Sequence, residues 1–298
     1  MRILRAAFFE LAGAMRTRRA LVLILLYLAA SLLGMNGSIT ALGKMEDQLA
    51  EVLQVERVNG KSGVVSAALW KSKQFQKIVR GMVGDSLVYD DIMGKHPAEL
   101  LYALIVFLAV PLLSVLVSSR RVAEEVKSGS AKYMLLRVTR LEFTLSKYLG
   151  QALLMLAGLL IGAVGAWCIA AFRLSGADLP ALFPAMLMWS VKAWFLSLAW
   201  LGLALGVSHF FKSGAKADAV AILMMIAWYV IPALLRHYAN GPVSGRFLVL
   251  TRLFPSSVSD MLWRSSFMPV ATCAAWLFMI GLFWLSFGHV YFAGRDVR

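Results

Sequence analysis

Long runs of apolar residues alternate with shorter polar stretches along the whole chain. A helix needs about 20 apolar residues to cross the hydrocarbon core of a bilayer, and six runs approach or exceed that length. The runs are residues 20–43, 100–119, 148–172, 179–211, 219–235 and 267–292. The pattern therefore predicts an all-α polytopic membrane protein, with six transmembrane helices in one domain over residues 20–298, an N-terminal interfacial helix and a helical extracytoplasmic insert.

The composition supports a membrane protein. Hydrophobic residues make up 60% of the chain, charged residues 15%, and the mean hydropathy is +0.74. A soluble globular domain carries about 25% charged residues, so this chain lies far outside that class. Its 298 residues would make about two soluble domains, but six spans with their loops also fill this length.

The formal net charge of +14 raises the question of an acidic partner. The basic residues flank the apolar runs and do not form one face, which favours membrane-flanking positions over nucleic-acid binding. Cys168 and Cys273 lie inside apolar runs, which argues against a disulfide scaffold or a CxxC metal site. We expect no nucleic-acid partner and no metal.

Residues 1–19 have the pattern of an amphipathic helix on the membrane surface. The apolar stripe is Ile3, Leu4, Ala7, Phe8, Leu11, Ala14 and Met15, and the basic residues around it are Arg2, Arg5, Arg16, Arg18 and Arg19. Such a helix places its apolar side among lipid headgroups and its basic side toward anionic lipids. A signal peptide is the alternative, but no clear small-x-small cleavage site follows Leu33.

Residues 38–99 are a polar insert with eight basic and eight acidic residues. Apolar residues recur in it at helical spacing, so we expect two or three amphipathic helices on the extracytoplasmic side, available to an outer partner. Gly60-Lys61-Ser62 matches the end of a phosphate-binding P-loop, but Val55 stands where that loop needs a glycine. We therefore expect no nucleotide site in the insert.

Two features inside the apolar runs suggest specific roles. Gly158, Gly162 and Gly165 lie at three- and four-residue spacing in the third run. Small residues at this spacing let a neighbouring helix approach closely. Lys192 interrupts the fourth run, so we expect it to face a wet cavity, as a candidate pathway residue, or to reach the outer surface. Alternatively, residues 179–191 are partly interfacial.

Residues 119–150 carry ten charges in 32 residues, between two apolar runs. Two pairs of opposite charges stand at the i,i+4 spacing that favours a helix. They are Arg120 with Glu124, and Arg121 with Glu125. Gly129 ends this helix, and the apolar spacing from Leu141 onward predicts a second helix that leads into the third run. By periodicity alone, an ordinary solvated loop is an equally good explanation.

The order of residues in this segment resembles the cytoplasmic segment of ABC-2 type transporter permeases. The matching residues are Glu125, Gly129-Ser130, Leu135-Leu136, Thr139-Arg140, Lys147 and Gly150. Ser130 replaces the usual threonine, and Arg137 stands where proline is common. In that family the segment is a coupling helix that lies against the ATP-binding subunit. The resemblance implies a cytoplasmic coupling region at 119–150, with Arg120, Arg121, Glu124, Glu125, Gly129, Ser130, Arg140 and Lys147 as coupling residues.

The resemblance also implies partners. Family members work as a pair of permease chains, in a homodimer or heterodimer, with two ATPase subunits that bind ATP and Mg²⁺, so no cofactor is expected on this chain. Val122 and Val126 would enter a groove on the ATPase, from a short helix nearly parallel to the membrane. Residues 236–266 resemble the re-entrant segment that such exporters place away from the ATPase.

The charges near the span ends suggest an orientation. Residues 1–19 have five basic residues against one acidic, and residues 119–150 seven against three. By the positive-inside tendency both segments are cytoplasmic, and six spans then place both termini in the cytoplasm of a bacterial inner membrane. Residues 236–266, with four basic residues and one acidic, do not follow this tendency on the outer side.

Three functions remain open from the sequence. The ABC exporter permease is favoured, and a membrane-embedded enzyme and an ion-coupled carrier are the alternatives. No common catalytic motif occurs, and His96, His209, His237 and His289 are scattered over loops and span ends, so we expect no enzyme. A carrier usually has several buried ionisable groups, whereas Lys192 is the only charge within a predicted span.

Overall fold

The computed structural model describes residues 2–16, 18–53, 86–93, 95–174, 179–238 and 253–294, and the single positions 73, 76, 77, 80 and 251. The helices are α1 (Arg2–Arg16), α2 (Arg18–Leu53), α5 (Ser86–Ile92), α6 (Pro97–Ser118), α7 (Arg121–Ser128), α8 (Ser130–Leu135), α9 (Arg140–Arg173), α10 (Leu179–Ser208), α11 (Gly214–Tyr238), α13 (Pro255–Val258), the 3₁₀ helix η1 (Ser259–Trp263) and α14 (Phe267–Gly294).

Six helical stretches are long and apolar enough to cross a membrane. They are Leu21–Lys44, Pro97–Ser128, Arg140–Arg173, Leu179–Ser208, Gly214–Leu235 and Phe267–Gly294. The part of the chain that the structure describes contains no strand element. The predicted class, an all-α polytopic membrane protein with six spans, is confirmed.

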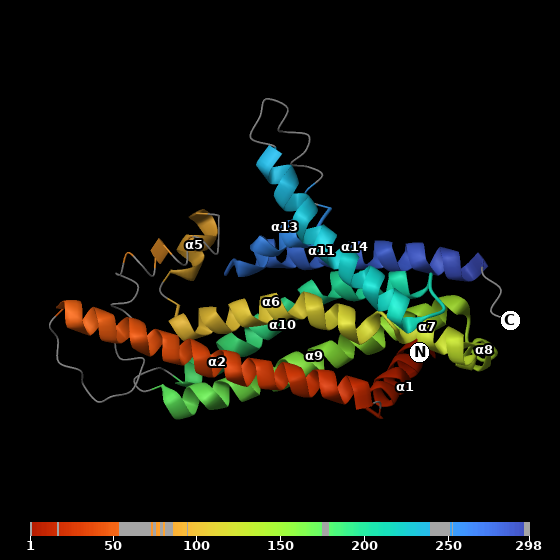
Figure 1. The fold of residues 1–298 in the computed structure, drawn as a ribbon, viewed down its shortest axis with the longest axis horizontal. Helices are drawn as coiled ribbons and strands as arrows, with labels where there is room; N and C mark the ends of the chain where they lie inside the picture. The colour runs from red at the N-terminus through yellow and green to blue at the C-terminus, as the bar shows by residue number, and fades with distance from the viewer. Residues whose placement is uncertain are drawn as a thin grey trace.

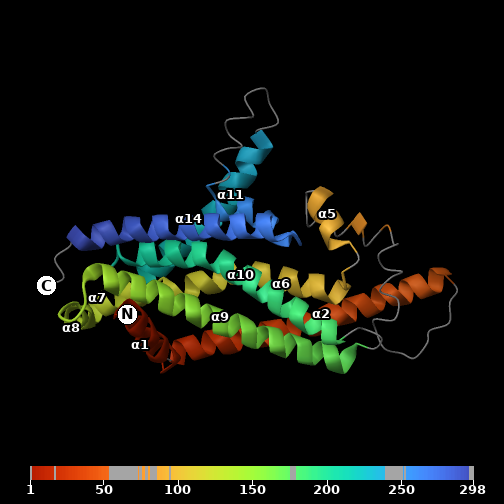
Figure 2. The same cartoon turned by 180° about the vertical axis from the view of Figure 1, so that it is seen from behind.

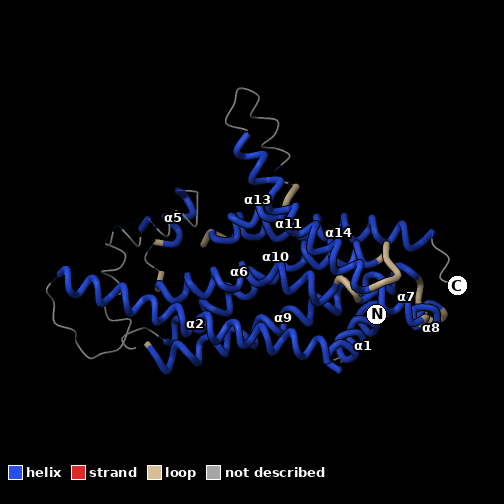
Figure 3. The backbone as a smooth tube through the Cα atoms, in the orientation of Figure 1, coloured by secondary structure: helices blue, strands red, loops and turns tan. Residues whose placement is uncertain are grey.

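The long helices α2, α6, α9, α10 and α14 run along the long axis of the molecule, and α11 crosses them steeply (Figures 1 and 2). Loops lie at the ends of the helices (Figure 3). We call the end that holds α1, α7, α8 and both described chain ends the α7 end, and the opposite end, with α5 and the start of α6, the α5 end.

Helix α10 is the centre of the bundle. Inside its apolar window 83% of the residues are buried, against 22% for the spans in α2 and α11. Its sequence is apolar on every side, which is the pattern of a helix surrounded by protein. Trp189, Trp200 and Leu203 are among its buried side chains, and α6, α9, α11 and α14 pack around it. Four of the other five spans therefore pack directly on α10, and α2 packs on α6 and α9.

Glycines bring α10 and α14 into backbone contact. A Cβ atom on Gly202 would overlap the backbone of Gly281, and one on Gly206 would overlap the backbone of Trp284. A Cβ on Gly288 would in turn overlap Gly206. The Gly202-x-x-x-Gly206 spacing is the sequence signal for such an approach. This seam fixes α14 against the central helix.

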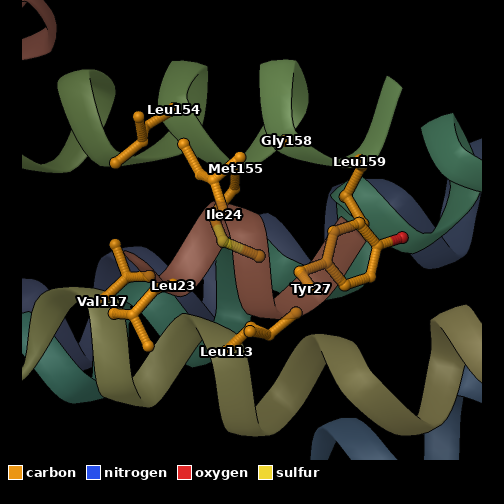
Figure 4. A pocket seen from close by; sticks show the side chains of 9 residues that line it. All are labelled: Leu23, Ile24, Tyr27, Leu113, Val117, Leu154, Met155, Gly158 and Leu159. Carbon is orange, nitrogen blue, oxygen red and sulfur yellow. The ribbon is translucent and has the colours of Figure 1, made fainter. Parts of the chain in front are cut away.

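The predicted glycine face of α9 makes a close helix contact, as expected, and the neighbouring helix is α2. The ring of Tyr27 fills the space beside Gly162, and Leu28 and Leu32 lie beside Gly165. Figure 4 shows the neighbouring hollow between α2, α6 and α9. Its lining is Leu23, Ile24, Tyr27, Leu113, Val117, Leu154, Met155, Gly158 and Leu159. With a volume of about 20 Å³ and apolar walls, it is a packing defect and not a path for cargo.

The first membrane helix is longer than the apolar run that predicts it. Helix α2 continues to Leu53, so the first part of the predicted insert 38–99 prolongs the span. The cause is visible in the packing, because Met35, Ile39 and Leu42 are buried where α2 meets α6. Helix α5 forms another part of the insert, and the P-loop-like Gly60-Lys61-Ser62 lies outside the described residues.

Helix α1 falls within the predicted interfacial segment 1–19, and it packs against α9. Ala7 and Glu10 are buried in this contact, where Gly150 leaves no room for a larger residue. Phe8 and Phe9 are exposed on the other side. The apolar stripe of the sequence is thus divided between protein and surroundings. The side chains of Arg2, Leu4, Ala14, Met15, Arg16, Arg18 and Arg19 are outside those described.

The segment predicted as re-entrant, residues 236–266, begins inside α11, which continues to Tyr238. Residues 239–250 and Arg252 lie outside the described residues, and the chain then forms α13 and η1 before α14. Leu262 of η1 is fully buried. The described part of this segment is therefore packed against the bundle.

Replacing Gly202 with alanine should destabilise the protein by about 1–3 kcal/mol, because the added methyl group forces α10 and α14 apart. Thermal unfolding of the detergent-purified protein would measure this. Gly37→Ala in α2 is the matched control, since a Cβ there meets no atom within 4 Å. Equal unfolding temperatures for the two variants would contradict a close backbone contact of α10 and α14 at Gly202.

Candidate functional site

The α7 end contains the helices that the sequence predicts in residues 119–150. Ser119 and Arg120 keep right-handed helical dihedral angles, so α7 follows α6 almost without a break. Gly129 ends α7 with φ = +76°, a conformation that favours glycine. Thr139 and Glu142 form a capping box that begins α9. Helix α7 is a separate element from α6, with Ser119 and Arg120 between them, and the expectation that it lies nearly parallel to the membrane stays a prediction.

Lys147 is the most buried charged side chain of this end, with 1% exposure. Its ammonium group forms ion pairs with Glu10 of α1 and Glu125 of α7. It also lies 5.2 Å from the centre of the Phe143 ring, one turn earlier in α9. We call Glu10, Glu125 and Lys147 the Lys147 cluster. It joins three helices that come from distant parts of the sequence.

The Lys147 cluster is a buried ionic group with unequal charges, two carboxylates and one ammonium. Removing a charged group from water costs several kcal/mol, and attraction between partners offsets this only when the partners stay in place. Loss of the ammonium would leave two buried carboxylates without a cation. The cluster therefore favours the single arrangement of α1, α7 and α9 that keeps all three side chains together.

A second set of contacts holds the beginning of α7. Asp218 of α11 accepts hydrogen bonds from the Ser119 hydroxyl and from the Arg120 guanidinium, which also pairs with it as an ion. The Ser208 hydroxyl at the end of α10 accepts the backbone N–H groups of Val122 at 3.2 Å and of Ala123 at 3.1 Å. These N–H groups are the unpaired donors of a helix start. We call Ser119, Arg120 and Asp218 the Asp218 tether.

The start of α9 holds the end of α14. The Arg140 guanidinium donates to the carbonyl oxygens of Phe292 at 2.8 Å and Ala293 at 2.5 Å. A cation at the carboxyl end of a helix also favours the helix dipole. The Phe143 and Phe292 rings stack with centroids 5.8 Å apart. Arg140, a predicted coupling residue, thus fastens the last span to the coupling region.

A hydrogen-bonded chain of Thr144 and two histidines lies next to these contacts. His209 Nδ1 donates to the Leu205 carbonyl oxygen at 2.7 Å, so its Nε2 accepts from the Thr144 hydroxyl at 3.3 Å. The Thr144 oxygen lies 3.0 Å from His289 Nδ1. Burial lowers the pKa of His209 to about 4. His209 is therefore neutral at neutral pH, as this bonding pattern requires.

The apolar residues expected to meet a partner are not the exposed ones. Val122 is fully buried and Val126 packs partly against the core, since α7 lies against the bundle. Exposed apolar side chains follow Gly129 instead: Tyr133 is 76% exposed and Leu136 82% exposed, with Met134 also exposed. We call Tyr133, Met134 and Leu136 the exposed tip.

A hollow of about 530 Å³ separates the exposed tip from α1. Its lining is Ala6, Phe9, Glu10, Tyr133, Met134, Leu136, Arg137, Val138, Phe143 and Ser146. Phe9 of α1 is itself exposed. The α7 end therefore presents an uncovered apolar surface beside a buried ionic cluster.

The remaining predicted residues lie around this site. Glu124 is exposed and Arg121 half-buried on α7, and the Ser130 hydroxyl bonds the Ser128 hydroxyl at 2.9 Å. Lys192 is buried and bonds the Arg264 carbonyl oxygen just after η1. Among the described residues, no three His, Cys, Asp or Glu side chains gather as a metal site needs.

Glu10, Ser208 and Asp218, which hold α7 and Lys147, are not among the predicted residues. Two of them had a weak sequence signal. Glu10 is the only acidic residue among residues 1–19, and Asp218 stands at the edge of an apolar run. Charges in such places tend to be paired, but the sequence alone does not name the partner.

Lys147→Met should destabilise the protein by about 3–5 kcal/mol, because the carboxylates of Glu10 and Glu125 then face each other without a cation. Thermal unfolding in detergent would show the loss. Lys132→Met on exposed α8 is the control and should change stability by no more than about 0.5 kcal/mol. Equal unfolding temperatures for Lys147→Met and Lys132→Met would show that the Lys147 cluster does not stabilise the protein.

A comparison with known families identifies the chain. The profile described as "ABC-2 family transporter protein" matches residues 7–288, which run from within α1 into α14 and include all of α7 and α8. No curated protein matches the sequence. The chain belongs to the ABC-2 transporter family and is a multi-pass membrane permease of that family.

Proposed function

We propose that this chain forms half of the translocation pathway of an ABC exporter, driven by separate ATPase subunits that dock on the α7 end. The observation that carries the proposal is the combination of a firmly held α7 with an exposed apolar tip immediately after it. A partner that docks on the uncovered apolar tip would displace α7. Because α7 is held by several helices, these helices would move with it. ATP and Mg²⁺ would bind to the partner.

The contacts of α7 support transmission to the membrane spans. Glu125 connects α7 to α9 and α1 through Lys147, and Arg120 connects it to α11 through Asp218. Ser208 connects it to the central helix α10. A displacement of α7 by a partner would therefore move several spans together, which is the coupling that an ATP-driven switch requires.

The exposed tip has the composition of an interface centre. Protein interfaces commonly place aromatic residues and methionine at the centre, with charged residues around them. Tyr133, Met134 and Leu136 are exposed between Lys132 and Arg137, which are also exposed. The basic residues would favour an acidic rim on the ATPase.

A second permease chain, identical or homologous, would complete the pathway. Helix α11 exposes a stripe of apolar side chains at helical spacing: Leu223, Ile226, Val230 and Leu234. This stripe and the poorly buried α2 are the surfaces that we assign to the partner chain and to lipid. The direction of export and a possible extracytoplasmic partner belong to the same proposal, and nothing in the chain identifies the cargo.

We assign the α7 end to the cytoplasm of a bacterial inner membrane. The basic excess of residues 119–150 and the location of α1, α8 and the end of α14 at the same end support this. The insert 38–99 is then extracytoplasmic, and both termini are cytoplasmic.

Truncating the exposed tip with Tyr133→Ala and Leu136→Ala should lower retention of a co-expressed ABC ATPase at least about tenfold, because the interface loses its apolar centre. Co-purification at fixed salt measures this. Phe267→Ala is the control, since Phe267 is 80% exposed at the other end of α14. Unchanged retention, or vigorous ATP hydrolysis by the isolated chain, would refute the proposal.

Single cysteines at Ser128 and Ser265, in a Cys168→Ser and Cys273→Ser background, should react with an impermeant thiol reagent from opposite sides of the membrane. Both positions are exposed, at opposite ends of the bundle. Labelling of whole cells and of inverted vesicles would be compared. If one preparation labels both cysteines, the orientation and the span count are wrong.

A further inference from the structure

At the α5 end, two segments far apart in the sequence form one layer. Ser265, just after η1, donates its backbone N–H to the Asp91 carboxylate at 3.3 Å and its hydroxyl to the Asp91 carbonyl oxygen at 3.3 Å. Trp263 of η1 packs against the buried cluster that includes Val88 of α5. We call α5 and residues 259–266 together the cap.

The cap rests on an aromatic platform formed by α6 and α10. The Trp263 ring lies 5.1 Å from the Trp189 ring and 5.1 Å from the Phe107 ring. Trp189 Nε1 donates to the Glu99 carboxylate at 2.7 Å, and the Lys95 ammonium lies 4.9 Å from the Trp189 ring. Trp189 is therefore held in a fixed orientation beneath the cap.

Lys192 joins the cap to this platform. Its side chain is 5% exposed, and its ammonium lies 4.3 Å from the centre of the Trp189 ring, one turn earlier in α10. The same ammonium donates to the carbonyl oxygen of Arg264 at 2.8 Å. Trp189 belongs to α10 and Arg264 belongs to the cap, so the Lys192 side chain connects α10 to the cap.

We propose that Lys192 holds the cap closed against α10. We call the Lys192 contact between α10 and the cap the clasp, and the Lys192 side chain itself the latch. When the cap lifts, the ammonium loses its bond to the Arg264 carbonyl oxygen, and Trp263 loses its ring contacts with Trp189 and Phe107. The closed cap is favoured because the charge-assisted hydrogen bond and the ring contacts exist only in it. The Asp91 to Ser265 bonds make α5 and η1 move together, and the latch therefore controls both.

The clasp connects α5, which is part of the insert, to the central helix α10. Helix α10 is the central helix and shares the glycine seam with α14. A ligand that binds the insert, or a displacement of α10, reaches the other through Lys192. This device goes beyond the transport function, because it describes how the cap is held whatever partner drives the protein.

Disulfide formation tests the clasp in the full-length protein in membranes. Asp91→Cys and Ser265→Cys are introduced without Cys168 and Cys273, with a protease site within residues 239–250. Under mild oxidation the two fragments should stay joined after cleavage until a reductant is added. A second measurement tests the hold on α10. A single cysteine that replaces Leu262, which is fully buried on the inner side of the cap, should react slowly with an impermeant thiol reagent, and Lys192→Met should speed this reaction about tenfold. Trp189→Phe, which removes the indole N–H, should speed it less.

Lys212→Met is the matched control, because Lys212 is exposed at the α7 end and should leave the rate of this thiol reaction unchanged. Asp91→Cys with Ser128→Cys should not cross-link, since the two positions lie at opposite ends. The amount of protein in the membrane shows that each variant is inserted. A failure of the Asp91 and Ser265 positions to cross-link overturns the cap. Equal rates of the thiol reaction for Lys192→Met and Lys212→Met overturn the latch.

Discussion

The burial of Lys147 is the constraint on which the α7 end depends. An ammonium group with 1% exposure needs partners that offset its desolvation, and α1 and α7 each supply a carboxylate here. Helix α1 contributes Glu10 only because Gly150 lets it lie directly against α9. Helix α7 contributes Glu125 only because it follows α6 and ends at Gly129. The position of the exposed tip thus depends on the buried Lys147 together with the contacts of Ser208 and Asp218 at the start of α7.

The two buried lysines are stabilised in different ways, and the difference suggests different mobilities. Lys147 has two carboxylate partners, which are charged hydrogen-bond acceptors and hold strongly. Lys192 has a backbone carbonyl and an aromatic ring, which together hold a cation more weakly. The α7 end is therefore built to stay together while it moves, and the cap is built to be released at moderate cost. This asymmetry suits a protein that receives force at one end and opens at the other.

The sequence predicts the spans well because their length and apolar composition are local properties. It also predicts the break at Gly129, a helix from Leu141 onward and a close helix contact at the glycines of α9, since each depends on local spacing, but it does not predict that α2 makes this contact. It does not predict the partner of Lys147, because Glu10 lies 137 positions away and nothing local selects it. The burial of Val122 was missed for the same reason: a residue that looks exposed on an isolated helix is covered when α7 packs on α10.

The packing also indicates which spans can move. Helices α10 and α14 meet backbone to backbone along the glycine seam, so a shift between them would have to break many close contacts at once. Helices α2 and α11 are the least buried spans and can move at lower cost. Asp218 ties the first turns of α11 directly to the start of α7. Under the proposed function, a push on the exposed tip would reach α11 most directly through the Asp218 tether, while the α10–α14 pair would serve as the fixed frame.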